Sequence, residues 1–211
     1  SGLMEVIISP MIEMLPTDNK SGNMSLLHSF YCWGQAVTTL GTTFLLRTFG
    51  YRGWTYIPLI WAVIPLINAF SFLKVPIVEP EPERKSDSFK DLVKSRRFRC
   101  FMVIMMCSGA SEIAMAEWAS MFAQQALGVT KVIGDLAGPC AFAVLMGTGR
   151  VVYAKFSERI SYRKTLIAMS VLCTACYFVT AFVKIPVFAL ISCAVCGFTV
   201  SLFWPGTLSA G

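Results

Sequence analysis

The stretch "FMVIMMCSGASEIAMAEWASMFA", residues 101–123, decides the fold class of this chain. It is long enough to cross the hydrocarbon core of a bilayer, which takes about 20 residues of helix. Glu112 and Glu117 are its only charged residues. We therefore interpret the stretch as a membrane-spanning helix that carries carboxylates inside the membrane.

The composition of the whole chain supports the same interpretation. Of its 211 residues, 55% are hydrophobic and 14% are charged, whereas soluble domains are usually about 45–50% apolar and about 25% charged. The charges are clustered, and further apolar runs lie between the clusters, at residues 2–15, 26–46, 54–73, 133–154, 165–183 and 187–208. The sequence thus predicts an all-α polytopic membrane protein, a helical bundle of about seven spans.

The Lys and Arg residues are distributed unevenly between the two predicted sides of the membrane. Fourteen of the 18, Arg150 among them, are assigned to the connections after the first, third and fifth runs. Basic residues are enriched in cytoplasmic connections, so we expect these connections to face the cytoplasm of a bacterial plasma membrane. This topology accounts for the net charge of +6 and gives no indication of a nucleic-acid partner.

One connection divides the chain into two parts. Residues 74–100, "KVPIVEPEPERKSDSFKDLVKSRRFRC", alternate proline with acidic residues and then become basic and weakly amphipathic. This pattern is typical of a linker followed by a helix at the membrane surface, or of a solvated loop without a partner. We expect residues 1–73 to be the last part of an N-terminal bundle, residues 74–100 a cytoplasmic linker, and residues 101–211 the first four spans of a C-terminal bundle.

A faint repeat links the two predicted bundles. Gly2 precedes Pro10 by eight residues in the first run, and Gly197 precedes Pro205 by eight residues in the last. Transporters with repeated halves carry such interruptions at corresponding positions. We therefore expect the first run to be the fourth span of one half and the last run to be the fourth span of the other, so that the chain is a piece of a longer protein.

Three stretches resemble the major facilitator superfamily and, within it, the fucose permease-like sugar transporters: "GLMEVIISPMIEMLP" (residues 2–16), "SLLHSFYCWGQ" (residues 25–35) and "MGTGRVVYAKFSERISYRK" (residues 146–164). On this resemblance the chain covers spans four to ten of twelve. The resemblance implies two six-helix bundles around a central cavity that opens alternately to either side. It also implies proton-coupled uptake of a sugar or a similar small polar solute.

Glu5 is the most informative residue of the first run. It lies about ten residues, or about 15 Å, from the polar loop that follows, near the bilayer midplane. An acidic residue there costs about 2.5–3.5 kcal/mol on insertion scales, so we expect it to have a role. Burial favours the protonated carboxyl group, and the resemblance implies proton coupling and sugar binding at this position. A hydrogen bond to a neighbouring helix is the alternative.

Other polar or aromatic residues within the runs are candidates for the same cavity. We expect Glu112 to take part in proton coupling, and we expect contacts with the solute from Ser9, Gln35, Asn68, Glu117, Trp118 and Trp204. Aromatic rings can stack on a sugar face, and amides can bind hydroxyl groups. Structural roles are the alternatives: interface anchors for the tryptophans, snorkelling for Glu117 and interhelical hydrogen bonds for the amides.

The connection between the fifth and sixth runs carries part of the superfamily's loop signature. Glu158, Arg159, Arg163 and Lys164 match its acidic and basic positions, whereas the glycines of the pattern are replaced. Ion pairs of such a loop can act as a latch that holds helix ends in one conformational state. Basic residues that only follow the topology rule are the alternative.

The remaining motifs argue against an enzyme or a metalloprotein. Cys173, Cys176, Cys193 and Cys196 have the spacing of a zinc site, but all lie in apolar runs, where cysteine packs as a small apolar residue. With no catalytic motif in the sequence, we expect no enzymatic activity, no cofactor and no bound metal. We expect a monomer in the lipid bilayer whose partners are a small-molecule solute and protons. An exporter of amphipathic compounds and a non-transporting solute sensor are the alternatives.

Overall fold

The computed structural model describes residues 8–12, 14, 16–17, 19–74, 89–157 and 159–210. These residues contain helices and turns and no strand, which confirms the all-α prediction. In chain order the elements are α2 (Lys20–Phe49), the 3₁₀ segment η1 (Tyr51–Tyr56), α3 (Ile57–Phe72), α4 (Phe89–Lys94), α5 (Arg96–Leu127), α6 (Lys131–Asp135), the π-helical turn η2 (Leu136–Cys140), α7 (Ala141–Phe156), α8 (Tyr162–Phe182), α9 (Pro186–Val200) and α10 (Phe203–Ala210).

Several of the helical segments can cross a membrane. Among the described residues, five are long and apolar enough: Arg52–Phe72, Arg96–Leu127, Lys131–Phe156, Tyr162–Phe182 and Pro186–Pro205. The run predicted at residues 26–46 lies within α2, whose 30 residues extend about 45 Å. α2 has the length of a span but is not among the five, because hydroxyl, amide and imidazole side chains dilute its apolar residues. Most of the run at residues 2–15 lies outside the described residues.

Local sequence signals explain where the helices begin and end. The side chain of Asn19 caps α2 by accepting a hydrogen bond from the backbone N–H of Gly22 (2.8 Å). Gly50 and Gly128 follow α2 and α5 with φ angles of 71° and 66°, a region that glycine adopts without the steric cost of a Cβ atom. Pro186 is the first residue of α9, where the missing N–H of proline has no intrahelical partner to lose.

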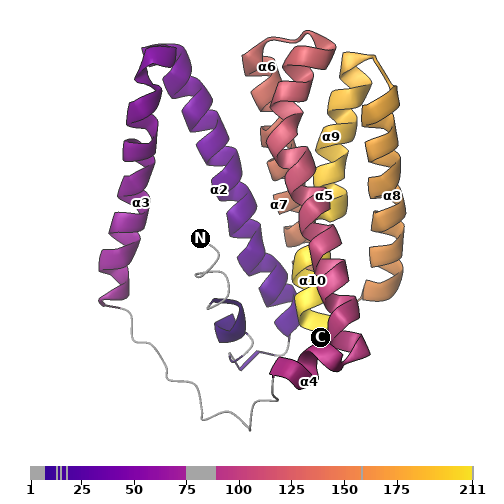
Figure 1. The fold of residues 1–211 in the computed structure, drawn as a ribbon. Helices are drawn as coiled ribbons and strands as arrows, with labels where there is room; N and C mark the ends of the chain where they lie inside the picture. Colours follow the sequence, from indigo (N-terminus) through magenta and orange to yellow (C-terminus); the bar gives the residue numbers. More distant parts are fainter. Residues whose placement is uncertain are drawn as a thin grey trace.

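The helices gather around α7 and α9 (Figure 1). α2 packs along α7, α9 packs against both α7 and α8, and α5 packs against α9. The contact between α7 and α9 is very close at Gly197, because a Cβ atom there would lie 2.2 Å from the backbone oxygen of Phe142. Phe142, Met146 and Val200 belong to one buried cluster, so the core of the protein lies between these helices.

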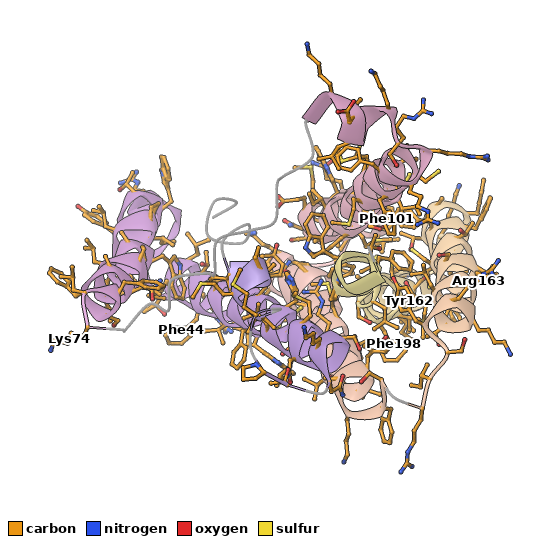
Figure 2. All side chains as sticks on the ribbon, turned by 90° about the horizontal axis from the view of Figure 1, so that it is seen from below. Phe44, Lys74, Phe101, Tyr162, Arg163 and Phe198 are labelled. Atoms are coloured by element: carbon orange, nitrogen blue, oxygen red, sulfur yellow. The ribbon has the colours of Figure 1, made fainter. Side chains whose placement is uncertain are left out.

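α3 stands apart from this group (Figure 1). None of its residues is buried, and its side chains project on several sides in the view of Figure 2. The indole Nε1 of Trp61 donates a hydrogen bond to Thr42 Oγ1 of α2 (3.0 Å). Exposed apolar residues such as Leu66 and Phe70 leave α3 with a surface suited to lipid contact.

Candidate functional site

A buried arginine lies inside the helical bundle. Arg150 belongs to α7, is 2% exposed, and is the largest fully buried side chain of the described residues. Its assignment to a cytoplasmic connection is therefore wrong, because α7 continues past it to Phe156 and neighbouring helices cover it. A charged side chain in the interior of a membrane protein needs partners, and these helices supply them.

Glu112 of α5 supplies the opposite charge. Its Oε2 atom lies 3.3 Å from Nη2 of Arg150, and its side chain is 16% exposed. The two residues form an ion pair that is largely shielded from solvent. Electrostatic attraction is stronger in such surroundings than in water, while removal of one partner leaves the other charge buried, at a cost of about 3–5 kcal/mol.

The guanidinium group of Arg150 also binds backbone carbonyl groups of other helices. Its Nη1 donates to the carbonyl oxygen of His28 in α2 (2.7 Å), and its Nε donates to that of Ser201 (3.1 Å). In the opposite direction, the hydroxyl group of Ser25 in α2 donates to the carbonyl oxygen of Arg150 (2.9 Å). One residue of α7 thereby joins α2, α5 and the end of α9.

The carbonyl group of Ser201 is available because the last span is interrupted. The apolar run predicted at residues 187–208 contains two helices, α9 and α10, separated by the turn Ser201–Leu202. The end of a helix leaves carbonyl groups without intrahelical partners. The interruption therefore places a hydrogen-bond acceptor beside Arg150, deep among the helices.

Glycines of α7 allow the neighbouring helices to approach. A Cβ atom on Gly149 would lie 2.5 Å from the hydroxyl oxygen of Ser201, and one on Gly147 would lie 3.1 Å from Cβ of Cys32 in α2. Small residues at such contacts let helix backbones come close together within membranes. The sequence Gly-Thr-Gly-Arg that ends at Arg150 thus brings the guanidinium group within reach of backbone atoms on both sides.

This arrangement can respond to protonation of a carboxyl group. Protonated Glu112 carries no charge, so it can no longer form an ion pair with Arg150. The guanidinium group remains charged under physiological conditions and must then rearrange or find another anion. Because the same group binds the carbonyl oxygen of His28, protonation of Glu112 is physically linked to the contact between α7 and α2.

A second polar cluster joins α2 to α5 and α6 near the opposite end of α2. Asp135 is 7% exposed and accepts hydrogen bonds from the hydroxyl groups of Thr43 (3.0 Å) and Ser120. Lys131 forms an ion pair with Asp135 at 3.2 Å. The cluster borders a cavity of about 320 Å³ whose lining includes threonines of α2. α2 is therefore held against the other helices both near its start and near its end.

Sequence comparison identifies the family of the chain. Residues 1–210 match the profile of the Major Facilitator Superfamily. The chain belongs to this superfamily. Comparison with curated proteins and with solved structures gives no significant match. The superfamily consists of membrane transporters for small solutes, so the resemblance found in the sequence is confirmed at this level, and the chain is a multi-pass membrane transporter.

Some of the site residues predicted for this superfamily transporter lie inside the helical bundle. Glu112 forms the ion pair with Arg150, and Ser9 is buried. The side-chain oxygen of Gln35 and the indole nitrogen of Trp204 are buried without a hydrogen-bond partner among the described residues. Both atoms therefore have hydrogen-bonding capacity that the described residues leave unused.

Other predicted solute contacts lie on the surface of the described helices. Trp118 is 61% exposed, and Glu117 beside it on α5 is also exposed. Asn68 is exposed on α3, which has no buried residue. The structure does not bring these side chains to the ion pair of Glu112 and Arg150.

The predicted latch of this superfamily transporter lies at the junction of α7 and α8. Arg159, Arg163 and Lys164 are all exposed there, and Arg163 points away from the helices in Figure 2. Glu158 lies outside the described residues, as does Glu5. The roles assigned to these residues therefore stay predictions.

Arg150 and Asp135 are the charged residues that sequence reasoning missed in this transporter. Both lie within the run predicted at residues 133–154. A charge inside a span indicates a partner on another helix. The location of Arg150 and Asp135 within an apolar run was therefore the signal that could have identified them as site residues. The identity of the partners could not be read from the run, because Glu112 and Thr43 belong to other helices.

Proposed function

We propose that the protein is a secondary active transporter that couples the uptake of a sugar, or of a similar small polar solute, to the inward movement of protons. The observation that carries this proposal is the shielded ion pair of Glu112 and Arg150, whose guanidinium group also binds α2. Coupling requires two elements. One is a carboxyl group that exchanges a proton, and the other is a helix contact that depends on the charge of that carboxyl group.

Proton binding can drive transport only if it changes the relative stability of two conformations. With Glu112 ionised, the carboxylate balances the charge of Arg150, and Nη1 of Arg150 donates a hydrogen bond to the carbonyl oxygen of His28. With Glu112 protonated, the guanidinium group is a buried charge without its counter-charge, which costs about 3–5 kcal/mol. We therefore propose that protonation weakens this arrangement of α2 against α7.

Alternating access also requires contacts that open on one side of the membrane at a time. α2 has a contact of this kind in each half: the bonds of Ser25 and His28 with Arg150, and the bond of Thr43 with Asp135. From the distribution of basic residues, we propose that the first contact closes the cytoplasmic side and the second closes the outer side.

The proposed solute is small and polar. The buried side-chain atoms of Gln35 and Trp204 offer hydrogen bonds for hydroxyl groups, and the resemblance of residues 2–35 to fucose permease-like transporters favours a sugar. Glu5, with the neighbouring Ser9, is proposed to supply a second proton-coupling carboxyl group and a solute contact. The exposed residues Asn68, Glu117 and Trp118 gain no support from their positions and are left out of the proposed site.

Exposed basic residues lie at the junction of α7 and α8. We propose that Arg159, Arg163 and Lys164, with Glu158, form a latch on the cytoplasmic side of a bacterial plasma membrane, and that the protein acts as a monomer. The exposure of the three basic residues supports this role, because an ion-pair latch has to reach partners on other helix ends.

Uptake into proteoliposomes tests the proposed function. Full-length protein would be reconstituted and supplied with a panel of radiolabelled monosaccharides, with the medium more acidic than the lumen. We expect at least one sugar to accumulate above its external concentration, and we expect a protonophore to abolish the accumulation. Sugar binding without accumulation would contradict the proposal in favour of a sensor, and proton-driven expulsion of amphipathic compounds would contradict it in favour of an exporter.

A further inference from the structure

Basic residues gather where α4 ends and α5 begins. Exposed cationic side chains follow one another closely there, at Lys90, Lys94, Arg96, Arg97 and Arg99. α5 begins at Arg96, before the span predicted from residue 101. The first turns of this membrane-spanning segment, Arg96–Leu127, are therefore cationic.

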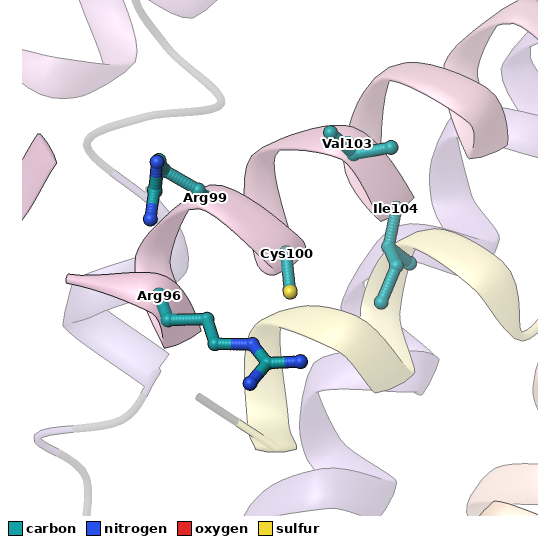
Figure 3. Close-up of a pocket in the computed structure, with 5 residues that line it drawn as sticks. All are labelled: Arg96, Arg99, Cys100, Val103 and Ile104. Atoms are coloured by element: carbon teal, nitrogen blue, oxygen red, sulfur yellow. The ribbon is translucent and has the colours of Figure 1, made fainter. Parts of the chain in front are cut away.

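A pocket of about 450 Å³ lies beside these turns and is lined by Arg96, Arg99, Cys100, Val103 and Ile104. Figure 3 shows Arg96 and Arg99 toward the start of α5, Cys100 between the charged and apolar groups, and Val103 and Ile104 further along the helix. The pocket thus changes from cationic to apolar in the direction in which α5 continues into its span.

Arg96 and Arg99 are the cationic residues of the pocket. Neither Arg96 nor Arg99 takes part in an ion pair between residues that the structure describes. A guanidinium group has a planar set of N–H donors that matches the oxygens of a phosphate group. The cationic end of the pocket is therefore suited to a phosphate-bearing anion.

We propose that this pocket binds the phosphate headgroup of an anionic phospholipid, with an acyl chain lying along Val103 and Ile104. The charge distribution predicts that this end of α5 faces the cytoplasm, and anionic lipids of the cytoplasmic leaflet attract basic segments next to spans. A free phosphate ion would occupy only the cationic end, whereas a phospholipid uses both ends of the pocket. The proposal does not depend on which solute the transporter moves.

Basic residues beside a span also occur simply because they fix its topology. The two explanations differ in which positions matter. The pocket requires Arg96 and Arg99, whereas topology and general attraction to an anionic surface depend on the number of charges. Replacement of Lys90 and Arg97 by Gln removes the same charge from the same segment without touching the pocket lining, so this double variant is a matched control.

Native mass spectrometry of the full-length protein in non-ionic detergent tests the binding. Phosphatidylglycerol, phosphatidylcholine and inorganic phosphate would be titrated separately. We expect preferential retention of phosphatidylglycerol, weakened about fivefold for each arginine replaced in Arg96→Gln/Arg99→Gln, and nearly unchanged in Lys90→Gln/Arg97→Gln. Equal retention by the pocket variant and the wild type, or equal losses in both double variants, would overturn the proposal.

Cys100 provides a second readout in the unaltered protein, because its exposed thiol group lines the pocket. Bound phosphatidylglycerol should slow alkylation of Cys100, measured by peptide mass spectrometry, several-fold more than phosphatidylcholine does. Protection by inorganic phosphate as strong as that by phosphatidylglycerol would contradict a lipid site. Unchanged alkylation at saturating phosphatidylglycerol would do so as well.

Discussion

Nη2 of Arg150 lies 3.3 Å from Oε2 of Glu112, so a cation of α7 meets an anion of α5 inside the bundle. The same guanidinium group binds the carbonyl oxygen of His28 in α2. Protonation of the carboxylate therefore changes the partner of a group that also holds a neighbouring helix. Protonation of Glu112 is thereby linked to the packing of α2 against α7.

Replacement of Arg150 by Gln should destabilise the protein strongly. The variant leaves the Glu112 carboxylate without its counter-charge and removes the donors that bind His28 and Ser201. We expect a loss of about 3–5 kcal/mol in the free energy of unfolding, seen as a lower unfolding temperature in detergent. Glu112→Gln/Arg150→Gln should recover part of this loss, because no charge remains unpaired. A double variant no more stable than Arg150→Gln would contradict the ion pair.

Replacement of Gly197 by Ala should separate α9 from α7. The added Cβ atom would lie 2.2 Å from the backbone oxygen of Phe142, so the helices must move apart at a cost of about 1–3 kcal/mol. Gly109→Ala in α5 is the matched control, because a Cβ atom there has nothing within 4 Å. Thermal unfolding of both variants checks the prediction, and equal unfolding temperatures would show that the contact is looser than described.

The helices were predictable from sequence to the extent that they depend on local composition. Residues 101–123 lie within α5, the run at 26–46 lies within α2, and nearly all of the run at 165–183 lies within α8, because the length of an apolar run is itself a property of the sequence. The polar side chains of α2 find partners on other helices, as the bond from Ser25 to Arg150 shows, and these partners could not be read from the run at residues 26–46.

The candidate site was only partly predictable. Glu112 could be identified, because a carboxylate within a span is unusual. Its partner lies 38 residues away on another helix, and that pairing depends on how the helices pack. Pro205 is a local signal for the interruption at Ser201–Leu202, because proline has no N–H to donate to the carbonyl group four residues earlier, that of Ser201. That Arg150 binds this carbonyl group depends on how the helices pack.

Replacement of Asp135 by Asn should loosen the contact between α2 and α6. The variant keeps the size of the side chain but removes the charge that binds Lys131 and strengthens the hydrogen bond with Thr43. A hydrogen bond to a charged group contributes about 1.5–3 kcal/mol. The contact between Thr43 of α2 and residue 135 should therefore open at least several-fold more often.

Labelling of a cysteine introduced at Thr39, which lines the adjoining cavity, measures this opening. The background would have exposed Cys100 and Cys107 replaced by Ser, and the reagent would be an impermeant maleimide added outside. We expect faster labelling with Asp135→Asn and no change with Asp91→Asn, the control in the exposed pair with Lys94. Identical rates in both variants would show that Asp135 does not close the outer side.

The charge distribution predicts the orientation of the helices. A cysteine at Ser161, between α7 and α8, should react with an impermeant thiol reagent only from the cytoplasmic side. A cysteine at Lys184, between α8 and α9, should react only from outside, because these exposed positions lie at opposite ends of α8. The measurement uses the background in which Cys100 and Cys107 are replaced by Ser, in right-side-out and in inverted vesicles. Reversed sidedness would overturn the topology.

The central claim is that Glu112 couples proton binding to transport through Arg150, and Glu112→Gln tests it most directly. The amide keeps the size of the protonated carboxyl group but cannot titrate. Glu117→Gln is the matched control, since Glu117 is an exposed carboxylate on the same helix. Full-length wild type and both variants would be compared in proteoliposomes, with monodispersity and solute exchange without a gradient as controls for folding.

Accumulation of solute driven by an inward proton gradient is the decisive measurement. We expect accumulation by the wild type and by Glu117→Gln. In Glu112→Gln we expect exchange to persist while accumulation is lost, because the proton no longer has a site linked to the contact between α7 and α2. Accumulation by Glu112→Gln at the wild-type level would contradict the account.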